Sequence, residues 1–277
     1  MKIVLGIDGS KYARWAMEWG ARLPLRGPGR ILAVHAVDLA ALRAPVLAQS
    51  MIIGNRPFLQ AEEKRLEREA RRIAAEAKAS LAALKVEGKV VIEHGAPATM
   101  ILKHVRRGDL VALGNRGLSG LDRFLLGSVS TRVVQHAPCS VLVVKQPPRP
   151  LAKILLATDG SKSSEKVLRF LIQKLRPENL EVSIMHVMPF LRYPEIKEAG
   201  KALVDRYAEK LAMAGYRVSE VLKVGQPADE IIKLADRRKV DLIVAGAKGL
   251  GAVARFILGS VSTRLVQHSS CSVLVVR

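Results

Sequence analysis

The sequence predicts an α/β fold of two tandem Rossmann-like domains, each a five-stranded parallel sheet in the order 3-2-1-4-5 with helices on both faces. The first observation is an internal repeat: residues 124–145 (FLLGSVSTRVVQHAPCSVLVVK) recur at 256–277, with 17 of 22 positions identical. The second is that each copy alternates short β-branched runs with helical patterns, which is typical of parallel strands joined by crossover helices. Right-handed crossovers and one reversal of direction across the sheet then give the strand order.

The elements of the first copy follow from these patterns. Its strands are expected at 2–7, 30–36, 89–94, 109–114 and 140–145, and its helices at 11–24, 57–86, 98–107 and 129–136. The helix over 57–86 carries one apolar stripe that includes Leu66, Ile73 and Leu81 among charged residues, and one buried face is sufficient to explain it. The apolar insert 39–56 has no clear period, so a lid, a short helix and an interface all stay open.

The second copy repeats this order of elements. Its strands are expected at 153–158, 180–187, 217–224, 241–246 and 272–277, and its helices near 163–175, 194–214, 228–237 and 261–268. The offset between the copies is 151 residues up to the second strand and 132 from the fourth strand onward. The run QPPRP at 146–150 separates them, and proline cannot continue a strand. We therefore expect domains at 1–145 and 151–277, joined by a short, stiff linker.

Composition narrows the class of protein. Apolar residues make up 49% of the chain and aromatic residues only 4%, so the core is expected to consist of Ala, Val, Leu and Ile. No apolar run approaches the roughly 20 residues that span a bilayer, and the first residues lack a cleavage signal, so we expect a cytoplasmic protein with no membrane segment. Cys139 and Cys271 precede the same apolar run and are expected to be buried core thiols.

The net charge of +20 raises the question of a polyanionic partner, because a basic field attracts nucleic acids and membrane surfaces. The basic residues are scattered along both copies, and no basic run carries interleaved aromatic residues. A solvated, arginine-rich surface is therefore favoured, and a nucleic-acid-associated protein is kept as an alternative function.

Glycine-rich segments follow the first and fourth strands of each copy, where doubly wound sheets bind ligands. They are DGS (8–10), GNRG (114–117) and GS (127–128) in the first copy, and DGS (159–161), GAKG (246–249) and GS (259–260) in the second. Glycine lets the backbone approach an anion, and the first N–H groups of a helix are unpaired and partly positive. The pattern favours a bound phosphate, with hydroxyl donors from Ser128 and Ser130, and from Ser260 and Ser262.

Structural alternatives stay open beside the ligand. The serines can cap the helix, and the glycines can simply be turn residues. Asp8 and Asp159 can bond to a ribose or base, contact a metal indirectly, or cap the helix that follows. His35 and His186 close the second strands and are interpreted as satisfied histidines rather than catalysts, and no Cys, His and carboxylate cluster has the spacing of a metal site.

The spacing G-x2-G-x9-G-[ST] resembles the ATP-binding motif of the universal stress protein family. The resemblance covers nearly the whole chain as two family domains, and it includes the G-x-P runs at 95–97 and 225–227 and a closing P-x-SVLVV strand, in which Ser270 replaces the proline of the second copy. It implies an adenine nucleotide alpha hydrolase-like fold whose members pair through their last strands. This tandem chain is then an intramolecular pseudo-dimer; a further homodimer and an unidentified protein partner stay open.

The resemblance also implies which residues hold the nucleotide. In the first copy they are Ile7, Asp8, Ala36, Gly114, Arg116, Gly117, Gly127, Ser128, Val129 and Ser130. In the second copy they are Thr158, Asp159, Val187, Gly246, Lys248, Gly249, Gly259, Ser260, Val261 and Ser262. The residue after the histidine of the second strand meets adenine, and Ala36 is small where the family often has Val, which loosens that contact in the first copy.

The implied ligand is ATP, with AMP, ADP and a cyclic nucleotide left open. Mg²⁺ or Mn²⁺ would accompany the triphosphate, held by its oxygens and by water rather than by the protein. No Walker A pattern occurs, and no residue of the motif is placed as a base for water, so no catalytic residue is assigned and at most slow hydrolysis is expected. The favoured function is a nucleotide-responsive stress protein; a scaffold of the same fold that binds no nucleotide is the alternative.

Overall fold

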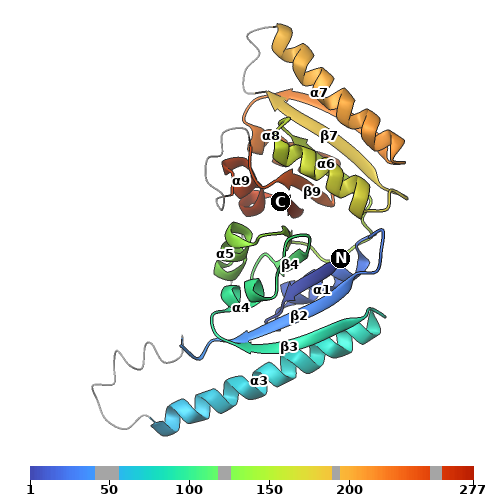
Figure 1. Ribbon diagram of the computed structural model, residues 1–277. Helices are drawn as coiled ribbons and strands as arrows, with labels where there is room; N and C mark the ends of the chain where they lie inside the picture. Colours follow the sequence, from blue (N-terminus) through green and yellow to red (C-terminus); the bar gives the residue numbers. More distant parts are fainter. Residues whose placement is uncertain (41–55, 118–125, 189–193, 250–257) are drawn as a thin grey trace, which may run out of the picture.

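The computed structural model describes residues 1–40, 56–117, 126–188, 194–249 and 258–277 (Figure 1). The first half contains β1 (Lys2–Gly6), α1 (Lys11–Arg22), β2 (Arg30–Val37), α3 (Arg56–Ala83), β3 (Gly88–His94), α4 (Pro97–Lys103), β4 (Leu110–Gly114), α5 (Ser128–His136) and β5 (Ser140–Val144). The second half contains β6 (Lys153–Thr158), α6 (Lys162–Lys174), β7 (Glu181–Met188), α7 (Pro194–Met213), β8 (Arg217–Val224), α8 (Pro227–Arg238), β9 (Leu242–Gly246), α9 (Ser260–His268) and β10 (Ser272–Val276). The predicted elements are all present, with small shifts at their ends except for the helix predicted at 98–107, which is shorter. Most of the insert 39–56 lies outside the described residues.

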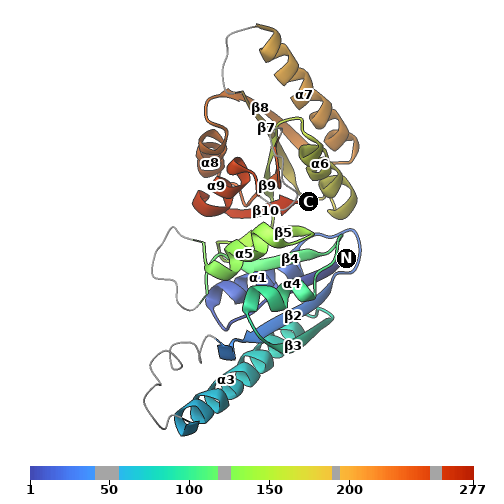
Figure 2. The same ribbon diagram turned by 60° about the vertical axis from the view of Figure 1, so that its left-hand side comes forward.

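The described strands form one continuous sheet in the order β3-β2-β1-β4-β5-β10-β9-β6-β7-β8. Within each half the strands are parallel and follow the predicted order 3-2-1-4-5. The halves meet at the centre of the molecule, where β5 and β10 pair antiparallel and Leu142 lies opposite Leu274 (Figure 2). The strands of the two halves therefore run in opposite directions, and their carboxyl ends lie at opposite edges of the sheet.

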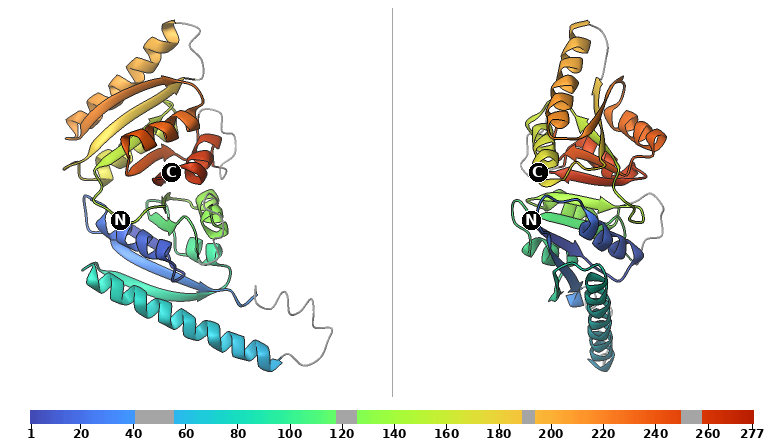
Figure 3. Two further views of the ribbon diagram at one scale, coloured as in Figure 1. Left: turned by 180° about the vertical axis from the view of Figure 1, so that it is seen from behind. Right: turned by 90° about the vertical axis from the view of Figure 1, so that its right-hand side faces the viewer.

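Both faces of this sheet are covered by helices (Figure 3). Every residue of β5 and β10 is buried, as expected for strands that need apolar side chains on both sides. Alternate strand residues join two cores: α1, α3, α6 and α7 cover one, and α4, α5, α8 and α9 cover the other. Each core runs through both halves, so the halves share their interior. Among the described residues, no helix is long and apolar enough to cross a membrane.

Beside the β5–β10 pair, each half contributes one cationic side chain that binds backbone carbonyls of the other half. Lys145 follows β5, and its Nζ donates to the carbonyl of Ser269 at the end of α9, at 2.6 Å. Arg277 follows β10, and its Nη2 donates to the carbonyls of Val134 and Gln135 in the last turn of α5, at 2.8 and 3.1 Å. The last carbonyls of a helix lack internal partners and carry partial negative charge. Each half therefore stabilises a helix end of the other.

The helix predicted at 98–107 ends earlier, at Lys103, and this part of the prediction is wrong. The Nζ of Lys2 donates to the carbonyl of His104 at 2.7 Å, and the N–H of Arg106 donates to Asp109 Oδ2 at 2.8 Å. Gly108 has φ of +87°, a conformation that glycine adopts without strain. A tight turn replaces the last helical turn because a side chain after the helix and one from β1 satisfy its backbone.

The two cysteines are buried free thiols, as predicted, with 2% of each residue exposed. Burial raises the pKa of both thiols from 9.0 to about 12. Between pH 9 and 12 the unfolded chain therefore loses thiol protons that the folded chain retains, so stability falls as pH rises, by about 1.4 kcal/mol per pH unit for each thiol.

The double variant Cys139→Ala/Cys271→Ala is expected to be less stable than the parent protein at pH 7, because it leaves two cavities. That deficit should shrink steadily above pH 9, since the variant has no thiol to ionise in its unfolded state. Urea unfolding at half-unit pH intervals measures the difference. A stability deficit that stays constant up to pH 11 would contradict the raised pKa of the two thiols.

Candidate functional site

A pocket of about 300 Å³ opens in the first half at the carboxyl ends of β1, β2 and β4. It contains every site residue that the sequence predicts for this half: Ile7, Asp8, Ala36, Gly114, Arg116, Gly117, Gly127, Ser128, Val129 and Ser130. These residues come from four separate parts of the chain. They meet because the sheet order places β1 beside β4 and the start of α5 above that point. This is the switch point of a doubly wound sheet, where ligands bind.

Other residues of the pocket were not predicted as site residues. Pro97 and Ile101 of α4 and Val34 of β2 line it together with His35. The G-x-P run after the third strand contains Pro97, and this signal could have indicated that the start of α4 belongs to the site. No local pattern indicates Ile101, because it reaches the pocket only through the packing of α4 against the sheet.

The start of α5 is open toward the pocket. Gly127 occupies the N-cap position and supplies no side-chain cap. Its own N–H donates to the carbonyl of Asn115 at 2.8 Å, and its carbonyl accepts from the N–H of Thr131 at 2.9 Å. The N–H groups of residues 128–130 have no acceptor among the described residues. Three parallel donors with the positive end of a helix dipole behind them form a site suited to an anion.

The two hydroxyls of this segment have different roles, and one prediction about them is wrong. The Ser130 hydroxyl is buried and donates to the carbonyl of Gly114 at 2.7 Å. In the second half, Ser262 donates in the same way to Gly246 at 2.6 Å. A hydroxyl has one hydrogen, so neither serine can also donate it to a phosphate. These serines tie the start of the helix to the end of β4 or β9, and Ser128 is exposed and free to take the donor role.

The glycines of the motif serve two different purposes. A Cβ at Gly114 would lie 2.5 Å from Tyr12 Cβ and 2.8 Å from its carbonyl carbon, so this glycine is needed for α1 to pack on β4. A Cβ at Gly127 would lie 3.5 Å from its nearest neighbours, which is ordinary contact, and its φ of −62° suits any residue. Gly259 is equivalent, with a nearest distance of 3.4 Å and φ of −66°. Contacts with the described residues and backbone conformation do not require glycine at 127 or 259.

Asp8 does not cap α1. Ser10 is the N-cap residue, and its Oγ accepts from the N–H of Ala13 at 3.1 Å. Asp8 Oδ1 accepts from the N–H of Ser10 at 2.9 Å. The other oxygen, Oδ2, faces the backbone of Gly117, where an added Cβ would lie only 2.5 Å away. The carboxylate thus lies beside both the first and the second glycine segment and lines the pocket.

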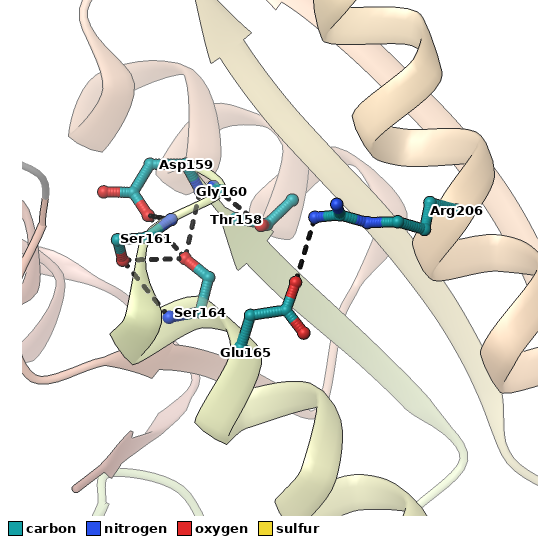
Figure 4. Close-up of polar contacts among 7 residues, drawn as sticks. All are labelled: Thr158, Asp159, Gly160, Ser161, Ser164, Glu165 and Arg206. Atoms are coloured by element: carbon teal, nitrogen blue, oxygen red, sulfur yellow. Dashed lines mark hydrogen bonds and ion pairs between the residues drawn. The ribbon is translucent and has the colours of Figure 1, made fainter.

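The second half binds its aspartate more tightly. Asp159 Oδ1 accepts from the N–H of Ser161 at 3.0 Å and from the hydroxyl of Ser164 at 2.5 Å (Figure 4). The first-half residue equivalent to Ser164 is Ala13, which has no hydroxyl. Burial raises the pKa of Asp159, but the hydrogen bonds from Ser164 and Ser161 outweigh burial and hold that pKa below its ordinary value of 3.8. The two copies of the site therefore differ in how firmly the aspartate is held.

Replacing Ser164 with Ala is expected to raise the pKa of Asp159, because the strongest donor to the charged carboxylate is removed. A lowered pKa stabilises the fold above the unfolded-state pKa, and this stabilisation is lost as pH falls through the folded-state pKa. The variant should therefore lose less stability on acidification. Carbon NMR titration of the carboxyl group measures the pKa. Ser164→Cys retains the size of serine but donates weakly and should behave like the alanine variant; an unchanged pKa in both would refute the role of Ser164.

The remaining site residues of the second half are arranged as in the first. Gly259 donates its N–H to the carbonyl of Ala247 at 2.8 Å, and an added Cβ there would lie 3.4 Å from Lys248 Cα and 3.5 Å from the N of Gly249. Asp159 Oδ2 faces Gly249 as Asp8 Oδ2 faces Gly117. These contacts bring the glycine segments, the aspartate and the start of α9, which includes Ser260, Val261 and Ser262, to one place. Thr158 and Val187, at the ends of β6 and β7, are buried.

The histidines that close the second strands are satisfied, as predicted. His35 Nδ1 lies 2.9 Å from the carbonyl of Ile7, and His186 Nδ1 lies 2.9 Å from the carbonyl of Thr158. A carbonyl only accepts, so Nδ1 carries the hydrogen in both rings. In the described parts of the chain, no group of three or more His, Cys, Asp and Glu residues could hold a metal ion.

Comparison with known proteins adds an independent finding. The family model described as "Universal stress protein family" matches residues 1–145 and, separately, residues 151–277. A universal stress protein of Mycobacterium tuberculosis is 28% identical over 306 residues, which cover 99% of this chain and 94% of that protein. The solved structure of a universal stress protein from Archaeoglobus fulgidus covers 100% of this chain and 96% of its own, with a TM-score of 0.74 and 21% identity. A family protein of Arabidopsis thaliana, solved with AMP bound, covers 45% of this chain and 90% of its own, with a TM-score of 0.36 and 22% identity.

Proposed function

The chain belongs to the universal stress protein family, and from this premise we propose that it binds an adenine nucleotide, with ATP as the leading candidate, in the pocket of its first half. The observation that supports this most strongly is the open start of α5. Three N–H groups without acceptors among the described residues lie beside Gly127, a glycine that neither backbone conformation nor packing requires. A bare backbone at such a place is explained by a ligand that needs the space.

The residues of the pocket match the parts of a nucleotide. The N–H groups of 128–130 and the hydroxyl of Ser128 would hold phosphate oxygens, as helix starts do. The Asp8 carboxylate is an acceptor suited to ribose hydroxyls. Apolar residues on the other side of the pocket, including Ile7, Ala36 and Ile101, suit the faces of a base. The pocket volume of about 300 Å³ falls at the small end of the range for ligand sites.

The second half repeats these features, and we propose a second nucleotide site at Thr158, Asp159, Val187 and the glycine segments 246–249 and 259–262. Val187 is larger than Ala36, and Ser164 fixes Asp159, so this site should be more rigid than the first. A divalent cation such as Mg²⁺ or Mn²⁺ would enter with a triphosphate, bound by phosphate oxygens and water.

Binding rather than rapid hydrolysis is the proposed activity. His35 holds its Nδ1 hydrogen toward the backbone of Ile7, and Asp8 accepts a hydrogen bond from its own loop, so both groups are arranged for structure rather than for proton transfer. The protein would then act as a nucleotide-responsive component of a stress response, regulatory or protective. The alternative is a scaffold of the same fold that has kept the glycines without a ligand.

Identification of bound nucleotide is the experiment that tests this proposal. Purified protein is denatured, the released nucleotide is identified and counted by mass spectrometry, and nucleotide-free protein is titrated with ATP by calorimetry. We expect up to two adenine nucleotides per chain and saturable binding of ATP. No released nucleotide together with no heat of binding for ATP, ADP or AMP would favour the scaffold.

A further inference from the structure

A second cavity of about 300 Å³ lies at the junction of the two halves, away from the glycine segments. We call it the junction groove. Its walls include Asp109 and Ser140 from the first half, Phe170 on α6 of the second, and Arg277 after β10. It lies at the edge where the strands of the first half begin, and the two chain ends marked in Figure 1 lie close to it. Nothing in the nucleotide proposal uses this groove.

The internal repeat defines an equivalent groove on the other half, and there the protein's own linker occupies the position. Asp241 is the counterpart of Asp109 by the offset of 132, and it forms an ion pair with Arg149 of the linker at 2.5 Å. Gln146 of the linker donates from Nε2 to the carbonyl of Ser270 at 2.9 Å. The edge of a half-sheet with this construction therefore accepts an extended, proline-rich chain of about five residues.

Burial of the aromatic residue differs between the two grooves. Trp19 is the counterpart of Phe170 by the offset of 151. Trp19 is 4% exposed, whereas Phe170 is only partly buried. The part of the chain that the structure describes supplies no segment to the junction groove. An occupant of the same shape would cover Phe170.

The charge of the junction groove indicates what kind of chain fits it. Lys166, Arg169 and Lys174 of α6 line the groove and are exposed. None of their side chains forms a hydrogen bond or ion pair within the described residues. Their counterparts in the other groove are Trp15, Glu18 and Leu23, and none of these is basic. Within the described residues, the junction groove therefore carries three unpaired cations at positions where the equivalent groove has no basic residue.

A fourth cation stands at the end of the groove. Arg277 has its Nε buried without an acceptor among the described residues, although its Nη2 donates to two carbonyls. Burial lowers the pKa of this guanidinium, which means that its charge is incompletely compensated. The acidic Asp109 is already paired with Lys2 at 3.2 Å. Carboxylates placed in the groove would compensate cations that are now unpaired.

We propose that the junction groove binds an extended acidic segment of a partner protein, seated as the linker is seated in the equivalent groove. The linker establishes that the shape suits an extended chain, and the three basic side chains of α6 establish which charge that chain should carry. The site is independent of the nucleotide pocket, so this proposal stands whether or not a nucleotide binds.

Fluorescence anisotropy with a labelled peptide tests the proposal. The probe is Glu-Pro-Pro-Glu-Pro-Glu, which resembles the linker in its proline content but has acidic side chains; Gln-Pro-Pro-Gln-Pro-Gln is the neutral control. At about 0.15 M salt, where non-specific surface attraction is largely screened, the acidic probe should bind and the neutral one should not. Zero-length carbodiimide coupling should then join probe glutamates to Lys166 or Lys174, located by mass spectrometry.

Charge reversal separates the groove from the general basic surface. Lys166→Glu/Arg169→Glu should weaken binding of the acidic probe at least about tenfold. The matched control Lys197→Glu/Lys210→Glu changes the same charge on exposed residues of α7 and should leave binding unchanged. Equal losses in both variants, or cross-links only outside α6, would overturn the proposal. Inorganic phosphate can be added at the same concentration of negative charge as the probe. Displacement of the probe would show that the groove binds small anions and would also overturn the proposal.

Discussion

Valine at positions 127 and 259 is expected to abolish nucleotide binding and leave the fold intact. The backbone at both positions has φ near −65° and extended ψ, which a β-branched residue adopts easily. An added Cβ would meet only ordinary contacts, at 3.5 and 3.4 Å. The isopropyl group would instead occupy space between the start of α5 or α9 and the glycine segment at 114–117 or 246–249, where we propose that the phosphates bind. We expect affinity for ATP to fall by at least about a hundredfold, or roughly 2.7 kcal/mol.

Calorimetry with ATP measures this loss, and urea unfolding at equal protein concentration measures stability. Gly27→Val is a matched control, because a Cβ there meets nothing within 4 Å and the residue is not among those that line the pocket. It should bind ATP as the parent protein does. Full nucleotide content in the 127/259 double variant would show that the phosphates lie elsewhere, and the site assignment would then fail.

Alanine at Gly114 is expected to produce the opposite result, a large loss of stability. A Cβ there would lie 2.5 Å from Tyr12 Cβ and 2.8 Å from the backbone carbonyl carbon of the same residue. Main-chain atoms of α1 cannot rotate away as a flexible side chain can, so the helix must shift from β4. Overpacking of this kind costs about 1–3 kcal/mol or more, and we expect a value near 3 kcal/mol.

The midpoint of urea unfolding checks this prediction, with Gly127→Ala as the control in the same motif. That control places a methyl group where contacts are ordinary and φ is negative, and such changes are neutral or slightly stabilising. Gly246→Ala should resemble Gly114→Ala, because its Cβ would lie 2.7 Å from Ser163 Cβ and 3.0 Å from its carbonyl carbon. Similar stabilities for the 114 and 127 variants would contradict the division of the motif into packing and ligand glycines.

Together these variants separate two requirements of the glycine motif, which are helix packing and space for a ligand. Gly114 and Gly246 allow a helix to lie against the end of a strand, which brings the first glycine segment to the second. Gly127 and Gly259 leave a space that the fold itself does not need. A sequence motif records both as the same letter, and only the contacts of each position separate them.

The position of the pocket of the first half, and ten of the residues that line it, could be predicted from the sequence and the family resemblance. The predicted residues lie at the carboxyl ends of β1, β2 and β4 or at the start of α5, and parallel strands bring their carboxyl ends together. Ile101 could not be predicted in this way, because it reaches the pocket from α4 through helix packing. The role of Ser130 could not be predicted from a local pattern either. Its hydroxyl bonds to the carbonyl of Gly114, sixteen residues away, and this partner is defined only when β4 and α5 are in place.

The sequence by itself determined the fold class, the two copies and the glycine segments, because hydrophobic period, turn residues and internal repetition are local properties of the chain. The family resemblance implied that the last strands pair, and the tertiary structure showed that β5 and β10 do so antiparallel within one continuous sheet, which places the two sites at opposite edges. Only the tertiary structure decided that the linker lies against Asp241 while the junction groove, built on the same plan, is lined by unpaired cations of α6. Contacts between residues so far apart in the sequence depend on how packed surfaces fit, and no local pattern contains that information.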